Sequence, residues 1–187
     1  MKNFDVDNNY LNFTGQTGSD AADLITILNQ ECISKKFISG NFFESGTYYG
    51  KSACIFLNLN TIKNAVLIDQ SNYLEIEKLK KLTDVPFEFV MEPSERFNFE
   101  KLGSKKSYLW AHLDSSHYFS NVENEILNII PYMKEYGLIC LDDWNDVYSQ
   151  VRAAYYYLYF KEKIDWELIL TGFNKAFLCD KKNFNYF

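Results

Sequence analysis

Short apolar runs alternate with segments of helical periodicity along most of this chain. A short apolar run bounded by polar residues is typical of a strand that is buried on both faces, whereas an apolar period of 3.6 residues is typical of a helix. Strands and helices that alternate in this way build a parallel sheet covered on both sides. The runs that predict strands are residues 42–43, 65–68, 87–90, 108–113 and 138–141.

The segments between these runs are predicted to be helices. Apolar residues at helical spacing follow residue 20, and Ser19 or Asp20 is the predicted N-cap. Residues 1–19 are polar and have no sustained period, so we expect an extended arm there. Further helices are predicted from about residue 51 and over residues 73–81, 122–135 and 146–163.

The chain ends in two apolar runs, residues 166–170 and 175–179, with only four residues between them. This connection is too short for a helical crossover, so the two runs should pair as an antiparallel hairpin. We therefore predict an α/β fold with a mostly parallel seven-stranded sheet, helices on both faces and a C-terminal antiparallel hairpin. The whole chain, 1–187, is expected to be one domain, with an arm and helix over 1–36 and a Rossmann-like core over 37–187.

Charge and composition exclude several classes of partner. The formal net charge is −6, and the lysines are scattered rather than gathered in a basic stripe. Proteins that bind nucleic-acid backbones usually carry such a stripe, so we expect no nucleic-acid partner and favour a small-molecule substrate.

The chain also lacks the features of exported and membrane proteins. No apolar window approaches the ~18 residues of a membrane span, and the N-terminus does not resemble a secretion signal. The four cysteines are far apart, which predicts neither a metal pair nor a disulfide framework. We expect reduced thiols, no membrane contact and a cytoplasmic location.

The first polar motif, Glu44-x-Gly46-x-x-x-Gly50-x-Ser52, follows the first predicted strand. Glycines at a strand-to-helix turn let the backbone pass close to a ligand. The motif differs from the G-x-G-x-x-G loop that cradles a diphosphate, because it opens with an acid and spaces its glycines four apart. A carboxylate there suits a cationic ligand; an ordinary turn is the alternative.

Further acids follow the second, fourth and fifth predicted strands, where open α/β sheets bind their ligands. Asp69 is placed to accept hydrogen bonds from ribose hydroxyls, with a helix cap as the alternative. Asp114, Asp142 and Asp143 end two strands and should converge. Like charges this close need a cation or a raised pKa, and carboxylates suit Mg²⁺, Mn²⁺ or Ca²⁺. The alternative is that one or two of them cap helices.

With these motifs, residues 44–143 resemble the class I S-adenosylmethionine (SAM)-dependent methyltransferases, in particular the macrocin or mycinamicin type of sugar O-methyltransferase and its small single-domain relatives. The resemblance implies that SAM is the cofactor and that Mg²⁺ or another divalent ion assists. It implies metal ligation by Asp114, Asp142 and Asp143. It implies cofactor binding by Glu44, Gly46, Gly50, Ser52, Asp69 (ribose), Ser94 (adenine) and Asp114.

One position departs from that family. Many relatives carry a second acid where this chain has Ser116, so that acid cannot serve as the base here. His117 stands three residues after Asp114, the spacing at which mycinamicin-type enzymes carry a histidine base, and an imidazole suits general-base work near neutral pH. A structural role for His117 is the alternative. His112, inside an apolar run, is predicted to be a packed core residue.

These observations predict metal-assisted O-methylation of a small hydroxylated molecule such as a sugar or a natural-product glycoside. Two alternatives stay open: a metal-dependent hydroxylase like the cephalosporin-hydroxylase group, and a methyltransferase-like protein that binds without turnover. The aromatic segment 155–160 is apolar on every helical face. We favour a homodimer contact for it over intramolecular packing.

Overall fold

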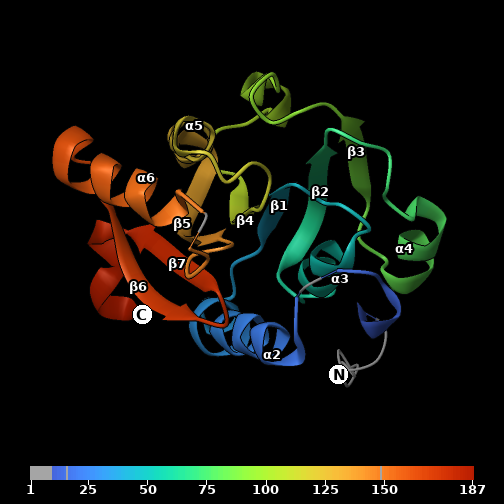
Figure 1. The fold of residues 1–187 in the computed structure, drawn as a ribbon. Helices are drawn as coiled ribbons and strands as arrows, with labels where there is room; N and C mark the ends of the chain where they lie inside the picture. Colours follow the sequence, from blue (N-terminus) through green and yellow to red (C-terminus); the bar gives the residue numbers. More distant parts are fainter. Residues whose placement is uncertain (1–9, 16, 148) are drawn as a thin grey trace.

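The computed structural model describes residues 10–15, 17–147 and 149–187. In this part of the chain seven strands form one sheet, in the order β3-β2-β1-β4-β5-β7-β6 (Figure 1). Strands β1 to β5 run parallel to one another, whereas β7 is antiparallel to both β5 and β6. The strands are β1 (Gly40–Ser45), β2 (Ile62–Asp69), β3 (Phe87–Met91), β4 (Tyr108–Leu113), β5 (Met133–Leu141), β6 (Trp166–Gly172) and β7 (Lys175–Asp180). The predicted fold is confirmed.

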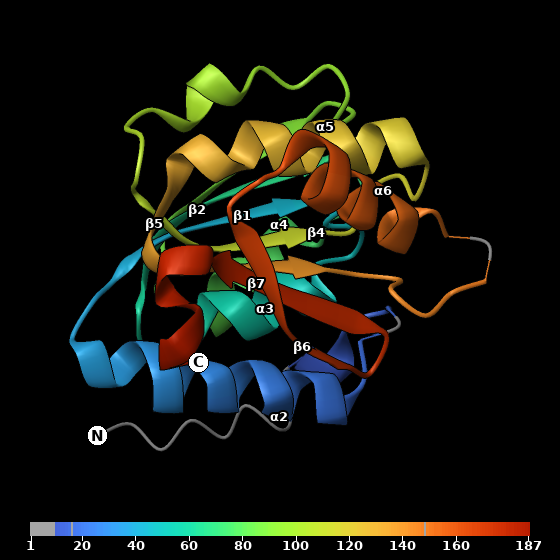
Figure 2. The same cartoon turned by 90° about the vertical axis from the view of Figure 1, so that its left-hand side faces the viewer.

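Helices cover both faces of the sheet. The helices are α2 (Ser19–Ile27), α3 (Lys51–Leu57), α4 (Ile76–Leu82), α5 (Phe119–Ile129) and α6 (Val151–Tyr157). Figure 2 shows α2 and α3 on one side of the sheet and α5 with α6 on the other. None of the helices within the described ranges combines the length and the apolar character that a membrane crossing requires.

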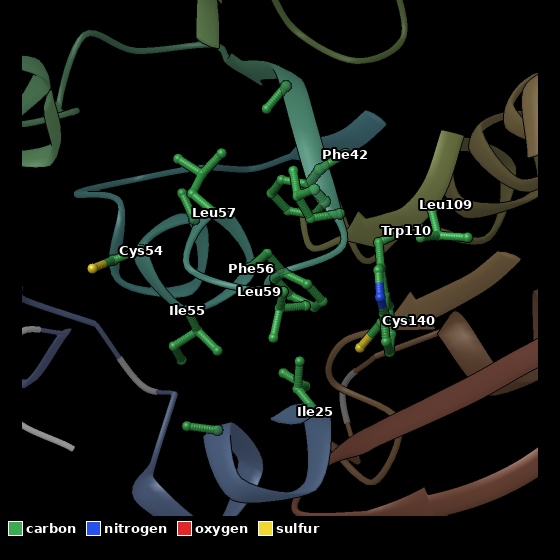
Figure 3. Close-up of a cluster of buried hydrophobic side chains, with 14 of the residues drawn as sticks. Ile25, Phe42, Cys54, Ile55, Phe56, Leu57, Leu59, Leu109, Trp110 and Cys140 are labelled. Carbon is green, nitrogen blue, oxygen red and sulfur yellow. The ribbon is translucent and has the colours of Figure 1, made fainter. Parts of the chain in front are cut away.

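Two hydrophobic clusters hold these layers to the sheet. Successive side chains of a strand point to opposite faces, so Phe42 packs toward α3 and Phe43 packs toward the α5 side. Phe42 stacks on Phe56 of α3 with ring centroids 4.6 Å apart. Figure 3 shows this cluster, in which Trp110 and Ile25 of α2 also take part.

Several predicted boundaries were wrong by a few residues. The N-cap of α2 is Gly18, and neither Ser19 nor Asp20 caps the helix. The helix predicted over 122–135 is α5, which ends at Ile129 because Pro131 follows, and β5 then begins at Met133 rather than at residue 138. Helix α4 begins at residue 76 instead of 73, and α6 begins at 151 instead of 146.

The expected N-terminal arm is only partly described, since residues 1–9 lie outside the described ranges. Residues 10–12 form a 3-10 turn, and Phe13 is buried against the α3 side of the sheet. The aromatic segment 155–160 lies on the opposite face, where Tyr155 is buried and Phe160 is exposed. The homodimer contact stays a prediction.

The strand order places β1 beside β4, with β2 and β3 on one side and β5 on the other. The chain therefore adds β2 and β3 on one side of β1 and then crosses over to add β4 and β5 on the other side. Open α/β sheets bind ligands beyond the carboxyl ends of their strands at such a switch point. The polar motifs after β1, β2, β4 and β5 all lie at this edge.

Candidate functional site

A cavity of about 1030 Å³ opens at the carboxyl ends of β1, β2, β4 and β5. Small-molecule sites commonly measure ~300–1,000 Å³, so this cavity has room for a cofactor and a second small molecule. Residues of the N-terminal segment, including Thr17 and Asp20, form one wall. The predicted site residues that line the cavity are Gly46, Ser52, Asp69, Ser94, Asp114, His117, Asp142 and Asp143.

Glu44 and Gly50 do not line the cavity, contrary to the prediction. The alternation of β1 directs Glu44 to the same face as Phe42, where its side chain is fully buried. There Glu44 Oε1 lies 2.8 Å from Nδ1 of His112. Gly50 is the N-cap of α3 with φ +94°, and a Cβ there would lie 2.6 Å from Leu74 Cδ1.

Gly46 is required by the chain's own backbone. Its φ is +79°, and an added Cβ would overlap the carbonyl of Asp114 and lie 2.8 Å from Ser115 Cα. The loop after β1 and the loop after β4 therefore touch through Gly46. This contact helps to position Asp114, which lines the cavity.

Gly46→Ala is expected to lower the free energy of unfolding by more than about 2 kcal/mol, because the left-handed backbone costs about 1–2 kcal/mol and the clash adds to it. Gly103→Ala is the comparison: its φ is also positive, +77°, but nothing lies within 4 Å of an added Cβ. Urea unfolding of both variants compares a positive-φ glycine that has a clash with one that has none. Equal losses in the two variants would contradict the role given to Gly46.

Asp69 ties two loops together at the end of β2. Its Oδ2 accepts a hydrogen bond from the backbone N–H of Tyr48 at 2.8 Å, and its Oδ1 accepts one from Ser71 at 2.9 Å. The N-cap of α4 is Glu75, so the helix-cap alternative for Asp69 was wrong. The carboxylate borders the cavity beside Tyr48 and Tyr73, whose ring centroids are 5.5 Å apart.

His117 lies between two carboxylates on the cavity wall. Its Nδ1 is 2.9 Å from Asp143 Oδ2, and its Nε2 is 3.5 Å from Asp114 Oδ1. The nearby Asp114 carboxylate raises the pKa of His117, burial opposes this, and Asp143 adds to the rise. Burial raises the pKa of Asp114 to about 7, against the lowering effect of His117. Among the described residues, His117 Nε2 has no hydrogen-bond partner, although it is buried.

Asp143 is fixed by the hairpin of β6 and β7. Asn174, in the turn between these strands, donates a hydrogen bond from Nδ2 to Asp143 Oδ1 at 2.8 Å. The backbone N–H of Trp144 donates to the carbonyl of Asn174 at 3.0 Å. Both carboxylate oxygens of Asp143 are therefore engaged, one by Asn174 and one by His117.

A second, deeper network joins Asp142 to buried bases. Lys175, the first residue of β7, donates to Asp142 Oδ2, and His112 Nε2 lies 3.4 Å from the same oxygen. Burial acts to raise the pKa of Asp142, but His112 and Lys175 outweigh it and hold the pKa well below its usual range. Burial and Lys175 act to lower the pKa of His112, whereas its bonds to Asp142 and Glu44 raise it to about 9.

His112 is buried as predicted, but it is more than a packed core residue, because it links Glu44 to Asp142. A further buried acid, Glu125 of α5, accepts a 2.6 Å hydrogen bond from the hydroxyl of Ser115. The hydroxyls of Ser115 and Ser94 are 2.9 Å apart. Ser94, predicted to lie near adenine, is thereby connected to the loop after β4.

Comparison with known proteins identifies the family. A family model described as a methyltransferase domain matches residues 43–144, which is more than half of the chain. The chain belongs to this family. The predicted resemblance and the predicted class of enzyme, a methyltransferase, are confirmed. Among curated proteins, none matches the chain.

Solved structures share the fold of this methyltransferase domain. CalS11, a TDP-rhamnose 3'-O-methyltransferase of calicheamicin biosynthesis, is 13% identical with a TM-score of 0.62, over 87% of this chain and 81% of its own. An O-methyltransferase from Bacillus cereus in complex with SAH is 13% identical with a TM-score of 0.62, over 90% and 84%. TomG from Streptomyces achromogenes, in complex with SAM, is 12% identical with a TM-score of 0.62, over 87% and 79%. At these identities the likeness shows the fold.

Sequence reasoning missed three residues of the methyltransferase domain's cavity and its support: Lys175, Asn174 and Glu125. Asn174 and Lys175 reach the cavity because β7 inserts beside β5, with Leu141 opposite Ala176. Lys175 carries the one local signal, since a lysine that opens an apolar strand must find an anionic partner if it is buried.

Proposed function

We propose that this protein, as one domain, transfers the methyl group of SAM to a hydroxyl oxygen of a small molecule. The arrangement that carries the proposal is the pair of His117 and Asp143 on the wall of a large cavity in a methyltransferase domain. Asp143 contacts Nδ1 of the imidazole, so Nε2 is the nitrogen that would accept a proton from the acceptor hydroxyl. Asp114 Oδ1 lies 3.5 Å from Nε2, which is longer than a well-formed hydrogen bond, so an acceptor hydroxyl could satisfy this nitrogen.

The cavity suits a cationic cofactor. Its charged lining includes the carboxylates of Asp20, Asp69 and Glu95 besides those of the site, whereas Lys51 and Lys175 are its lysines. When bound, SAM would supply a methyl group activated by a positively charged sulfur. The O-methyltransferases from Bacillus cereus and Streptomyces achromogenes hold SAH and SAM within the same fold, which supports this choice.

The chain's own residues would move the proton and align the acceptor. The acceptor hydroxyl would give its proton to His117 Nε2 while its oxygen forms a bond to the methyl carbon. SAM would supply that methyl group, and the electron pair of its carbon–sulfur bond would stay on sulfur. The geometric alignment of nucleophile and methyl group, rather than the base alone, would contribute most of the acceleration.

The proposed reaction does not use a metal ion. The predicted Mg²⁺ would be held by Asp114, Asp142 and Asp143, and carboxylates are its usual ligands. The residues present do not fit that ion, because the ammonium group of Lys175 already contacts Asp142 and would repel a second cation there. Mg²⁺ therefore stays a prediction that the contact between Lys175 and Asp142 disfavours.

A sugar or natural-product glycoside is the class of acceptor that we favour. The fold is shared with CalS11, whose substrate is a sugar nucleotide, and this likeness supports the choice at the level of fold. The size of the cavity agrees with a second ligand beside the cofactor. The cytoplasmic location also stays a prediction.

Calorimetric titration with SAM and with its demethylated product SAH tests the cofactor. We expect one molecule of either ligand per chain, and competition between them. Transfer of a radiolabelled methyl group to a panel of sugars, nucleotide sugars and glycosides then tests the reaction. A protein that binds neither ligand would refute the proposal; one that binds both but methylates nothing in a broad panel would favour the non-catalytic alternative.

A further inference from the structure

Lys175 brings a buried ammonium group to the carboxylates that end β4 and β5. Only 3% of its side chain is exposed, and its ammonium group contacts Asp142 Oδ2. The pairing of β5 with β7 causes this placement, since Leu141 lies opposite Ala176. Lys175 and Asp142, one residue beyond that pair on each strand, consequently face each other at the edge of the cavity.

A buried lysine at this position needs an explanation. Removing a charged group from water is expensive, and such a group persists only when an opposite charge lies beside it. Lys175 meets this condition through Asp142, while His112 meets it through Glu44 and Asp142. The positive charges that the buried acids require are thus built into the chain.

The ammonium group competes directly with a divalent ion. Two groups of side chains bring their ligand atoms within 4.8 Å of one another: His112, Asp114 and Asp142 form the first, and Asp114, His117 and Asp143 form the second. In the first group, Lys175 binds Asp142 and lies 3.4 Å from His112 Nε2. A cation held by Asp142 would be repelled by this ammonium group at short range.

The second group offers little more. His117 and Asn174 engage the two oxygens of Asp143. Asp114 is the carboxylate of this group with the fewest described partners. One carboxylate does not make a site for Mg²⁺, because this ion demands near-octahedral oxygen coordination. Hydrogen-bonding groups of the protein therefore already occupy part of this ligand set.

We infer that Lys175 is the resident cation of this site, which takes the place of a divalent metal ion and keeps such an ion out. The inference rests on the proposed function only for its consequence in catalysis. In that reaction the ammonium group of Lys175 donates a hydrogen bond to the acceptor oxygen and stabilises the negative charge that develops there. Lys175 in this role replaces a metal ion as the electrostatic stabiliser.

Titration with Mn²⁺ tests the inference without any substrate. Bound Mn²⁺ is measured as the loss of the free-ion signal in electron paramagnetic resonance. We expect the wild-type protein to bind no stoichiometric Mn²⁺. Lys175→Met, which removes the charge but keeps much of the side-chain volume, should bind one Mn²⁺ per chain. Lys175→Arg keeps the charge and should bind none. Adding Asp142→Asn to Lys175→Met should abolish the gained binding.

Wild-type protein that binds one Mn²⁺ per chain would overturn the inference, and so would a folded Lys175→Met variant that binds none. Circular dichroism establishes which variants are folded, and the wild-type titration decides the matter if Lys175→Met is not. SAM titrations of the same samples distinguish a failure of the proposed function from a failure of the role given to Lys175. Wild-type protein that binds neither Mn²⁺ nor SAM would refute the proposed function and leave Lys175 as the resident cation.

Discussion

Replacing His117 with alanine is expected to lower kcat by about 10²–10⁴-fold, which is the usual contribution of a positioned general base. The affinity for SAM should change little, because the proposed role of the imidazole is to accept a proton from the acceptor. The measurement is methyl transfer at saturating SAM with an acceptor from the panel, together with the calorimetric Kd for SAM. If His117 had only a structural role, its replacement would weaken SAM binding as well as lower kcat.

The pH dependence of the rate provides a second test of His117. A protonated imidazole cannot accept a proton, so the rate should fall as the pH decreases. Asp114 and Asp143 raise the pKa of His117 above its ordinary value of ~6.5, and the midpoint of the fall should therefore lie above that value. Asp143→Asn removes one of these negative charges, so the midpoint should move to lower pH.

His117→Asn is the matched control, because its amide can still donate a hydrogen bond to Asp143 but cannot act as a base. We expect it to be as slow as His117→Ala. If either variant kept the wild-type rate and pH profile, the acceptor would not need a base from this side chain, and the role of His117 would have to be withdrawn.

The fold was predictable because the apolar runs are local. Each buried strand is recognisable from its own short apolar run, and the short link before Lys175 is enough to indicate a hairpin. The boundary between α5 and β5 was not predictable in the same way. Residues 133–137 belong to β5 because Met133 pairs with Tyr108, a contact between segments far apart in the sequence.

The site was predictable in part for the same reason. Asp114, Asp142 and Asp143 follow strands that the sequence reveals, and their convergence follows from parallel strands ending at one edge. The sequence also indicates that these acids need a cation, but it does not indicate where the cation comes from. Lys175 reaches Asp142 through the insertion of β7 between β5 and β6, and no local pattern specifies that order.

Lys175→Met is expected to lower the free energy of unfolding by about 3–5 kcal/mol, the usual cost of removing one partner of a buried ion pair. The loss arises because Asp142, whose side chain is only 13% exposed, keeps His112 as its remaining described basic neighbour. The double variant Lys175→Met with Asp142→Asn should be more stable than the single variant, since it leaves no uncompensated anion. Urea unfolding at neutral pH, monitored by circular dichroism, measures all three proteins.

Lys182→Met supplies the comparison for an ion pair in contact with solvent. Lys182 pairs with Asp180 at 3.0 Å, but its side chain is 58% exposed, so its removal should cost no more than about 1 kcal/mol. If Lys175→Met cost as little as Lys182→Met, the ammonium of Lys175 would contribute no more than a surface charge, and Asp142 would have to find its compensation elsewhere. If the double variant were as unstable as Lys175→Met, the loss would come from packing of the lysine side chain rather than from its charge.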